Sequence, residues 1–205
     1  MRSVLPLVLL CTGLFLAVSA HSQQVDFMVG GSTLFSSSPT TASVAFQPPA
    51  EDGGVYPSAS LQVFPKSKKY GFSGEFSYRY KEGLYNGFQK FRPLLYDVNA
   101  IYAPHLTDDA RADLMAGIGG QTALFYNTFN NCNNNTGVCP ISVNSTHFAV
   151  HLGAGVRYYF WRSFFARPEI HYYRIIDNSQ FHSDNVFRAG VSIGYTFRPR
   201  PPKSK

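Results

Sequence analysis

Apolar and polar residues alternate along a segment near residues 148–160. One side of an extended chain there carries Phe148, Val150, Leu152, Ala154, Val156, Tyr158 and Phe160. The other side carries Ala149, His151, Gly153, Gly155, Arg157 and Tyr159. A period of two predicts a β-strand with one apolar and one polar face. The segment is long enough for a tilted strand to cross a bilayer, which needs about 9 to 11 residues.

Seven further segments alternate in the same way and predict an antiparallel sheet of eight strands. The predicted strands lie near residues 25–34, 58–64, 70–80, 92–103, 113–126, 146–160, 164–175 and 186–197. Long and short connections alternate between them, which is typical of an up-and-down membrane barrel. An even number of strands places both chain ends on the same side of the membrane.

The alternation alone does not decide which face meets the surroundings. A soluble lipocalin-like carrier would have an apolar lumen, whereas an outer-membrane barrel directs its apolar face to lipid. Aromatic residues gather at predicted strand ends, as in the girdles of membrane barrels. They are Tyr158, Tyr159, Phe160, Trp161, Phe164 and Phe165. The mean hydropathy of −0.12 agrees with a barrel, because lumen-facing residues dilute the average. We therefore predict an all-β, eight-stranded transmembrane barrel, with the carrier as an alternative.

The first twenty residues have the pattern of a secretory signal peptide. Arg2 provides the positive start, residues 4–18 the apolar core and residues 18–20 a small-residue cleavage site. The apolar stretch is shorter than the roughly 20 residues of a membrane-spanning helix. The expected organisation is a signal peptide at 1–20, a barrel at 21–197 and a basic, proline-rich periplasmic tail at 198–205.

The last predicted strand ends on an aromatic residue. Its apolar face carries Phe187, Ala189, Val191, Ile193, Tyr195 and Phe197. With this strand and the signal peptide, the chain resembles the small bacterial outer-membrane barrels, namely the membrane domain of the OmpA family and its OmpX-like relatives. The resemblance implies a monomer in the outer membrane, in contact with lipids and lipopolysaccharide, with both termini periplasmic. It also implies that Tyr195 and Phe197 form a signal for the barrel assembly machinery.

Charged residues of both signs fall on the predicted lumen face. They are Glu75, Arg79, Asp97, Arg157, Arg167, Glu169, His171 and Arg188. The interior of an eight-stranded barrel is just wide enough for side chains to fill, and buried charges need partners. We therefore expect a network of ion pairs that closes the lumen. A small-solute or ion pore is the alternative.

Cys132 and Cys139 are the cysteines of the predicted mature chain, and both lie in one long loop. We predict a disulfide between them, because export favours oxidation and the intervening Asn and Gly residues tolerate a tight turn. Two cysteines without a nearby histidine offer too few ligands for structural zinc. No metal site or cofactor is expected from the sequence.

These features favour a structural or surface-interaction role in the cell envelope. Loops 35–57 and 127–145 are the parts expected to contact an extracellular partner. The net charge of +6 does not indicate nucleic-acid binding, because the basic residues are scattered and the chain is expected to be exported. A lipid-modifying enzyme is a further alternative. Its candidate residues would be His151, Glu169 and His171, but the alternation turns them inward with no serine beside them.

Overall fold

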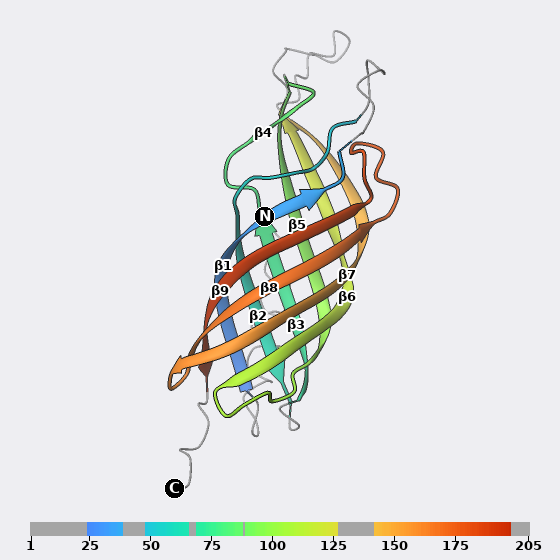
Figure 1. Cartoon of the computed structure of the whole chain (residues 1–205). Helices are drawn as coiled ribbons and strands as arrows, with labels where there is room; N and C mark the ends of the chain where they lie inside the picture. The colour runs from blue at the N-terminus through green and yellow to red at the C-terminus, as the bar shows by residue number, and fades with distance from the viewer. Residues whose placement is uncertain (1–23, 39–47, 66–68, 88, 127–141, 198–205) are drawn as a thin grey trace, which may run out of the picture.

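The computed structural model describes residues 24–38, 48–65, 69–87, 89–126 and 142–197. Its strands are β1 (Gln24–Ser36), β2 (Tyr56–Phe64), β3 (Tyr70–Tyr78), β4 (Gly83–Tyr85), β5 (Gln89–Tyr102), β6 (Ala110–Tyr126), β7 (Ser142–Trp161), β8 (Phe164–Ile175) and β9 (Asn185–Phe197). Neighbouring strands are antiparallel in the order β3-β2-β1-β9-β8-β7-β6-β5-β4, and β3 also pairs with β5. This last pairing closes eight strands into the tilted barrel of Figure 1. The described residues include no helix long and apolar enough to cross a membrane.

All eight predicted strands are present, and β4 is an addition. β4 pairs with the start of β5, from Gly83 opposite Phe91 to Tyr85 opposite Gln89. Asn86 and Gly87 adopt positive φ values of 50° and 81° in the turn between them, a conformation that Asn and Gly tolerate. Three residues are too few to show a period of two, so the sequence pattern does not reveal β4.

The apolar faces of the strands point outward and the polar faces point into the barrel. Arg157 is 0% exposed, whereas Tyr158 next to it is 58% exposed. The same contrast separates Arg167, which is buried, from Ile170, which is 53% exposed. A soluble carrier needs the opposite arrangement, so the lipocalin-like alternative is wrong.

The two ends of the barrel differ. At one end, which we call the turn end, the described chain begins and stops, with Val25 opposite Phe197. The β7–β8 turn also lies there, where Arg162 adopts a positive φ of 40°. The opposite, loop end holds the β4–β5 hairpin and the tips of β6 and β7, at the top of Figure 1.

Apolar clusters inside the barrel lie toward both ends. At the loop end one cluster contains Leu34, Tyr56, Leu95, Ala149, Tyr173, Ile175 and Val186. A second loop-end cluster contains Phe91, Ala123, Phe125 and Phe181, with Tyr85 packed against it. The turn-end cluster contains Phe64, Ile101, Ala103 and Met115. Arg157, Arg167 and Arg188 lie between the loop-end and turn-end clusters with their carboxylate partners, whereas buried Arg111 lies at the turn end and buried Glu51 at the loop end.

Candidate functional site

The middle of the barrel contains a connected set of buried polar side chains, which we call the lumen network. It consists of Asp26, Gln62, Glu75, Asp97, Asn99, Asp113, His151, Arg157, Arg167, Glu169, His171 and Arg188. All of these side chains come from the inward face of a strand, because residues two apart in a strand share a face. The network joins β1, β2, β3, β5, β6, β7, β8 and β9 across the lumen.

Arg157 of β7 is the centre of the part nearer the turn end. Its Nε donates to the Asp113 carboxylate at 2.8 and 3.1 Å, and its terminal nitrogens donate to Asp26 and Gln62. The guanidinium carbon also lies 5.0 Å from the ring centroid of Phe64 and 5.2 Å from that of Phe165. One guanidinium therefore bridges two buried carboxylates, from β1 and β6, and stacks with aromatic rings.

Arg167 and Arg188 form ion pairs with acidic residues in the part of the lumen network nearer the loop end. Arg167 forms an ion pair with Glu169 and donates to Asp113 at 3.4 Å, and its Nη2 lies 3.7 Å from Glu75 Oε2. Arg188 donates to Glu75 and, at 2.9 Å, to the Ser77 hydroxyl. The Glu75 carboxylate on β3 thus faces two guanidinium groups that come from the opposite side of the barrel.

Two histidines stack beside these ion pairs. The rings of His151 and His171 are 5.1 Å apart at an angle of 15°, and Tyr173 stacks on His151 at 4.6 Å. His151 Nδ1 lies 2.5 Å from Asn99 Oδ1, and His151 Nε2 lies 2.9 Å from His171 Nδ1. These contacts form a chain of hydrogen bonds that crosses the lumen from β5 to β8.

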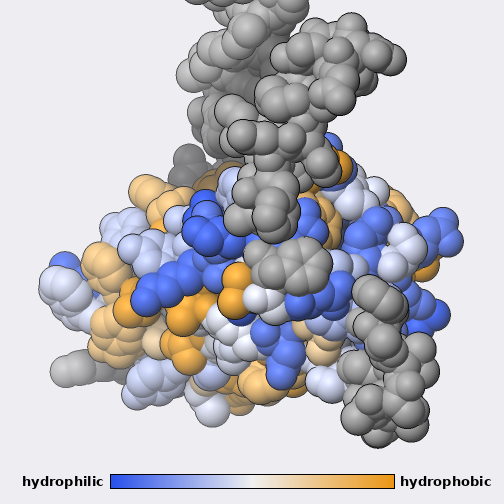
Figure 2. All heavy atoms as spheres, turned by 90° about the horizontal axis from the view of Figure 1, so that it is seen from above, coloured by the Kyte–Doolittle hydropathy of each residue, from blue (hydrophilic) through white to orange (hydrophobic). Residues whose placement is uncertain are grey.

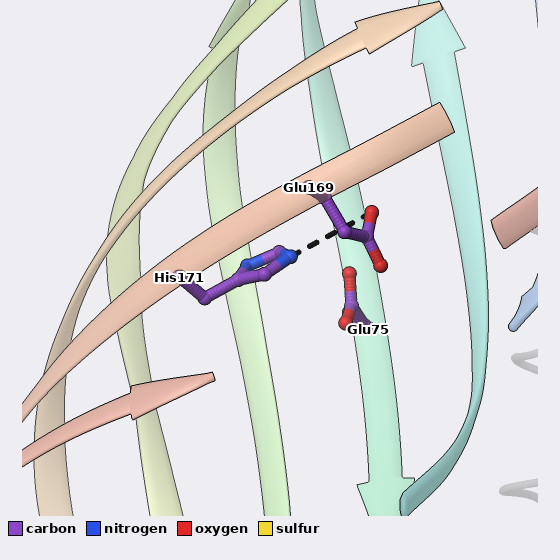
Figure 3. Close-up of side chains that lie close together, drawn as sticks. All are labelled: Glu75, Glu169 and His171. Carbon is purple, nitrogen blue, oxygen red and sulfur yellow. Dashed lines mark ion pairs between the residues drawn. The ribbon is translucent and has the colours of Figure 1, made fainter. Parts of the chain in front are cut away.

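Glu75, Glu169 and His171 form the group that could hold a metal ion. Their ligand atoms lie within 4.8 Å of one another, and all three side chains are buried. Figure 3 shows the His171 ring directed at the Glu169 carboxylate, 3.6 Å from Nε2 to Oε2, with the Glu75 carboxylate facing them from β3. The sequence pattern does not predict this group, because Glu75 is far along the chain from the other two residues.

Seven of the eight lumen residues expected from the sequence belong to the network. The eighth, Arg79, lies just after β3 at the loop end, where its guanidinium carbon is 5.4 Å from the ring centroid of Phe91. Asp26 and Asp113 were missed, although the alternation of their strands places them on the polar face. Applying the same rule to every predicted strand position would have found both.

The remaining predicted site residues fall elsewhere. Cys132 and Cys139 lie outside the described residues. Tyr195 and Phe197 lie on the outward face of β9, and Phe197 is 52% exposed. The assembly signal remains a prediction for these two residues.

A buried carboxyl group also lies at the loop end, outside the barrel strands. Glu51 is 0% exposed and accepts a hydrogen bond from Gln121 of β6. Burial raises the pKa of the Glu51 carboxyl to about 8. The surrounding segment 48–55, which we call the capping segment, is bonded to the barrel by Gly53 N to Leu34 O at 2.9 Å and Tyr80 N to Val55 O at 2.8 Å.

Comparison with known proteins identifies the family. Residues 7–197 match the family model described as the outer membrane protein beta-barrel domain, and the chain belongs to this family. Family and fold together make it an integral protein of the bacterial outer membrane. Comparison with curated proteins gives no match.

Several solved structures share the fold. Neisserial surface protein A is 13% identical, with a TM-score of 0.58 over 85% of this chain and 97% of that one. Ail of Yersinia pestis, solved with the heparin analogue sucrose octasulfate, is 14% identical, with a TM-score of 0.56 over 86% and 100%. The N-terminal barrel of Pseudomonas aeruginosa OprF is 15% identical, with a TM-score of 0.55 over 85% and 97%. At these identities the likeness establishes the fold alone.

Proposed function

We propose that this protein is a surface-interaction barrel, which binds a partner outside the cell through its loop end and keeps its lumen closed. The observation that supports this function best is the loop-end part of β6 and β7, residues 122–126 and 142–147, which we call the hairpin tip. The hairpin rises beyond the ends of the neighbouring strands, as Figure 1 shows. In the proposed orientation this tip projects away from the membrane, and both described chain ends lie on the periplasmic side.

The tip leaves one edge of β7 without a neighbouring strand among the described residues. Residues 142–147 pair with β6, from Ser142 opposite Tyr126 to His147 opposite Gln121. Pairing of β7 with β8 begins only at Ala149, opposite Ile175. An open edge can add an extended segment of another protein as a further strand. Ser142, Val143, Asn144 and Thr146 are exposed there, and three of the four are polar, which suits water rather than lipid.

The surface around the loop end offers polar contacts as well. Figure 2 looks onto this end and shows hydrophilic groups gathered there, with hydrophobic residues between them and toward the rim. The exposed charges include the pairs Lys90–Glu82 at 3.1 Å and Arg174–Asp184 at 3.5 Å. Exposed pairs of this kind contribute little to stability, so a partner can replace them at low cost.

A peptide library displayed on phage and selected on the refolded protein tests the edge. We expect selected peptides to slow hydrogen exchange at residues 142–147, because a new strand would bond to the open edge. Introducing charge with Val143→Lys and Thr146→Lys should weaken their binding, whereas Leu106→Lys at the turn end should not. Protection confined to another part of the barrel would contradict the proposed edge.

The closed lumen is a separate part of the proposal. Its support is the ion pairing of Arg157, Arg167 and Arg188 between apolar layers, together with the capping segment at the loop end. A conducting pore is the competing function. Purified protein in planar bilayers should give no conductance steps, and stable steps on the nanosiemens scale would establish the pore instead.

A catalytic function has less support. His151, His171 and Glu169 are engaged with each other and with arginine inside the barrel. Ser145 Oγ lies 2.9 Å from His147 Nε2 at the hairpin tip, but no salt bridge joins His147 to a carboxylate in the described part of the chain. We expect purified protein to release no fatty acid from lipopolysaccharide. Release that disappears in Ser145→Ala would show that the tip is an esterase site.

A further inference from the structure

The hydrogen-bond chain across the lumen fixes which nitrogen of His171 carries a proton. The Asn99 amide nitrogen donates to Asp97 at 2.5 Å and to Ser73 at 3.2 Å. An ionised carboxylate only accepts, so the carbonyl oxygen of Asn99 is the atom that faces His151. That oxygen requires a proton on His151 Nδ1. A neutral His151 then has its lone pair on Nε2, and His171 must donate to it from Nδ1.

The other nitrogen of a neutral His171 is therefore a bare lone pair. His171 Nε2 is buried and has no hydrogen-bond partner. It faces Glu169 Oε2 at 3.6 Å, as the dashed line in Figure 3 marks. Two electron-rich atoms that face each other in a buried place repel each other unless a positive charge lies between them. Arg167 already pairs with Glu169 Oε2, so the positive charge that His171 Nε2 lacks would come from a second proton on this nitrogen or from a bound metal ion.

The balance of buried charges inside the barrel also favours a bound cation. Apart from Glu51 at the loop end, the buried acids of the described barrel are Asp26, Glu75, Asp97, Asp113 and Glu169, and the buried arginines are Arg111, Arg157, Arg167 and Arg188. There is one more carboxylate than guanidinium, so a cation is attracted. The ligand types, one imidazole and two carboxylates, suit zinc and similar divalent transition metals.

We propose that His171, Glu169 and Glu75 form a binding site for a divalent transition-metal ion inside the barrel. Zinc holds such ligands at about 2.0–2.2 Å, so the three side chains must draw together by about 1 Å from their present separations. The His171–His151–Asn99 chain supplies the outer hydrogen bonds that orient a metal-binding histidine and fix its tautomer. Water can complete a four-coordinate site.

Arg167 competes with the metal for the same space. Its Nη2 forms an ion pair with Glu169 Oε2 and lies 3.7 Å from Glu75 Oε2. Binding of a metal requires Arg167 to leave these oxygens, and its second contact, Asp113 at 3.4 Å, is the partner it can keep. Arg188 does not have to move, because it bonds the other oxygen of Glu75. Loss of Arg167 should therefore strengthen cation binding.

Metal analysis of refolded protein tests the site. Because apolar layers lie on both sides of the network, zinc or cobalt is supplied during refolding in detergent, and free metal is then removed by desalting. We expect about one metal per folded chain and, with cobalt, visible absorption of a site with nitrogen and oxygen ligands. His171→Gln should lose the metal, and Arg167→Gln should retain it about tenfold more tightly.

Controls keep the result independent of folding. His182→Gln removes an exposed histidine at the loop end and should bind as the wild type does. Each variant is first shown to be folded by the faster gel migration of its unboiled sample. If the arginine variant does not fold, Glu169→Gln serves instead and should lose the metal. Folded wild-type protein that retains no metal, or retention that His171→Gln leaves unchanged, would overturn the proposal. The same holds if imidazole nitrogen shifts in nuclear magnetic resonance show a second proton on His171 and no response to zinc.

Discussion

The two faces of β7 place different demands on the residues that form them. Leu152 and Val156 on the outer face are 52% and 41% exposed, and their neighbours on that face are also apolar. His151 and Arg157 on the inner face are completely buried, and each contacts specific partners from other strands. The outer face needs only to be apolar, because lipid has no fixed shape. The inner face needs particular residues, because a buried charge without its partner is costly.

The largest effect should follow loss of Arg157. Arg157→Met would leave the carboxylates of Asp26 and Asp113 buried with a much weaker set of partners. Removing one partner of a buried ion pair destabilises a protein by about 3–5 kcal/mol. Urea unfolding in detergent, followed by gel mobility, measures this loss. The control is Arg174→Met, at an exposed ion pair with Asp184, which should cost less than about 1 kcal/mol. Equal stabilities of the two variants would mean that the buried ion pairs of Arg157 contribute no more to stability than an exposed ion pair.

An arginine introduced on the outer face of β7 tests whether this face contacts lipid. Leu152→Arg should cost about 2–4 kcal/mol in a bilayer if Leu152 lies near the midplane. Tyr158→Arg, closer to the turn end, should cost about 0–1 kcal/mol, because a charge near the interface can reach water. Urea titrations in phosphatidylcholine vesicles measure both values. A cost that does not depend on depth would mean that these positions do not face lipid.

Glycines test how closely the strands pack where side chains are absent. A Cβ on Gly119 would collide with the backbone oxygen of Tyr96 and lie 2.7 Å from Asp97 Cα, whereas a Cβ on Gly31 would meet nothing within 4 Å. Gly119→Ala should therefore lose about 1–3 kcal/mol, because backbone atoms cannot move aside easily. Gly31→Ala should leave stability nearly unchanged in the same unfolding assay. A larger loss of stability in Gly31→Ala than in Gly119→Ala would contradict the close packing of Gly119 against β5.

The most local effect concerns the capping segment, where burial raises the pKa of Glu51 to about 8 from an ordinary 4.5. The folded segment binds the proton more tightly than the open one. Its stabilisation is thus complete below pH 4.5, falls as the pH rises and is lost once the pH has passed about 8. Hydrogen exchange of the Gly53 amide should report an opening equilibrium that increases by up to about tenfold per pH unit in this range.

Glu51→Gln is the matched variant for this prediction. A glutamine has no proton to lose in this range, so opening should be independent of pH after correction for intrinsic exchange rates. A pH dependence that persists in Glu51→Gln would assign the effect to another group.

Much of the fold follows from local pattern. The alternation predicted all eight barrel strands, and the observed boundaries differ by a few residues, as at β5, which begins at Gln89 rather than near residue 92. The polarity of the inner face also predicted that Arg157, Arg167 and Glu169 lie inside. β3 ends at Tyr78 rather than at residue 80, so Arg79 lies just beyond it, where its guanidinium contacts Phe91 at the loop end instead of joining the lumen network.

The candidate site was only partly predictable. Sequence pattern gave the inward residues but not their partners, and it gave no reason to group Glu75 with His171. Asp26 contacts Arg157 across 131 positions of sequence. Such contacts depend on the stagger of the strands around the closed barrel, which no single strand encodes. Glu51 was also missed, because nothing in its local sequence marks a buried loop residue.

The sequence by itself determined the strand positions and which residues share a face of each strand. Both follow from a period of two, a property of each strand alone. Only the tertiary structure decided that β3 meets β5, that Arg157 pairs with Asp26 and Asp113, and that His171 faces Glu169 and Glu75. These outcomes require closure of the barrel, because side chains from distant strands come within hydrogen-bonding distance only when the sheet curves back on itself.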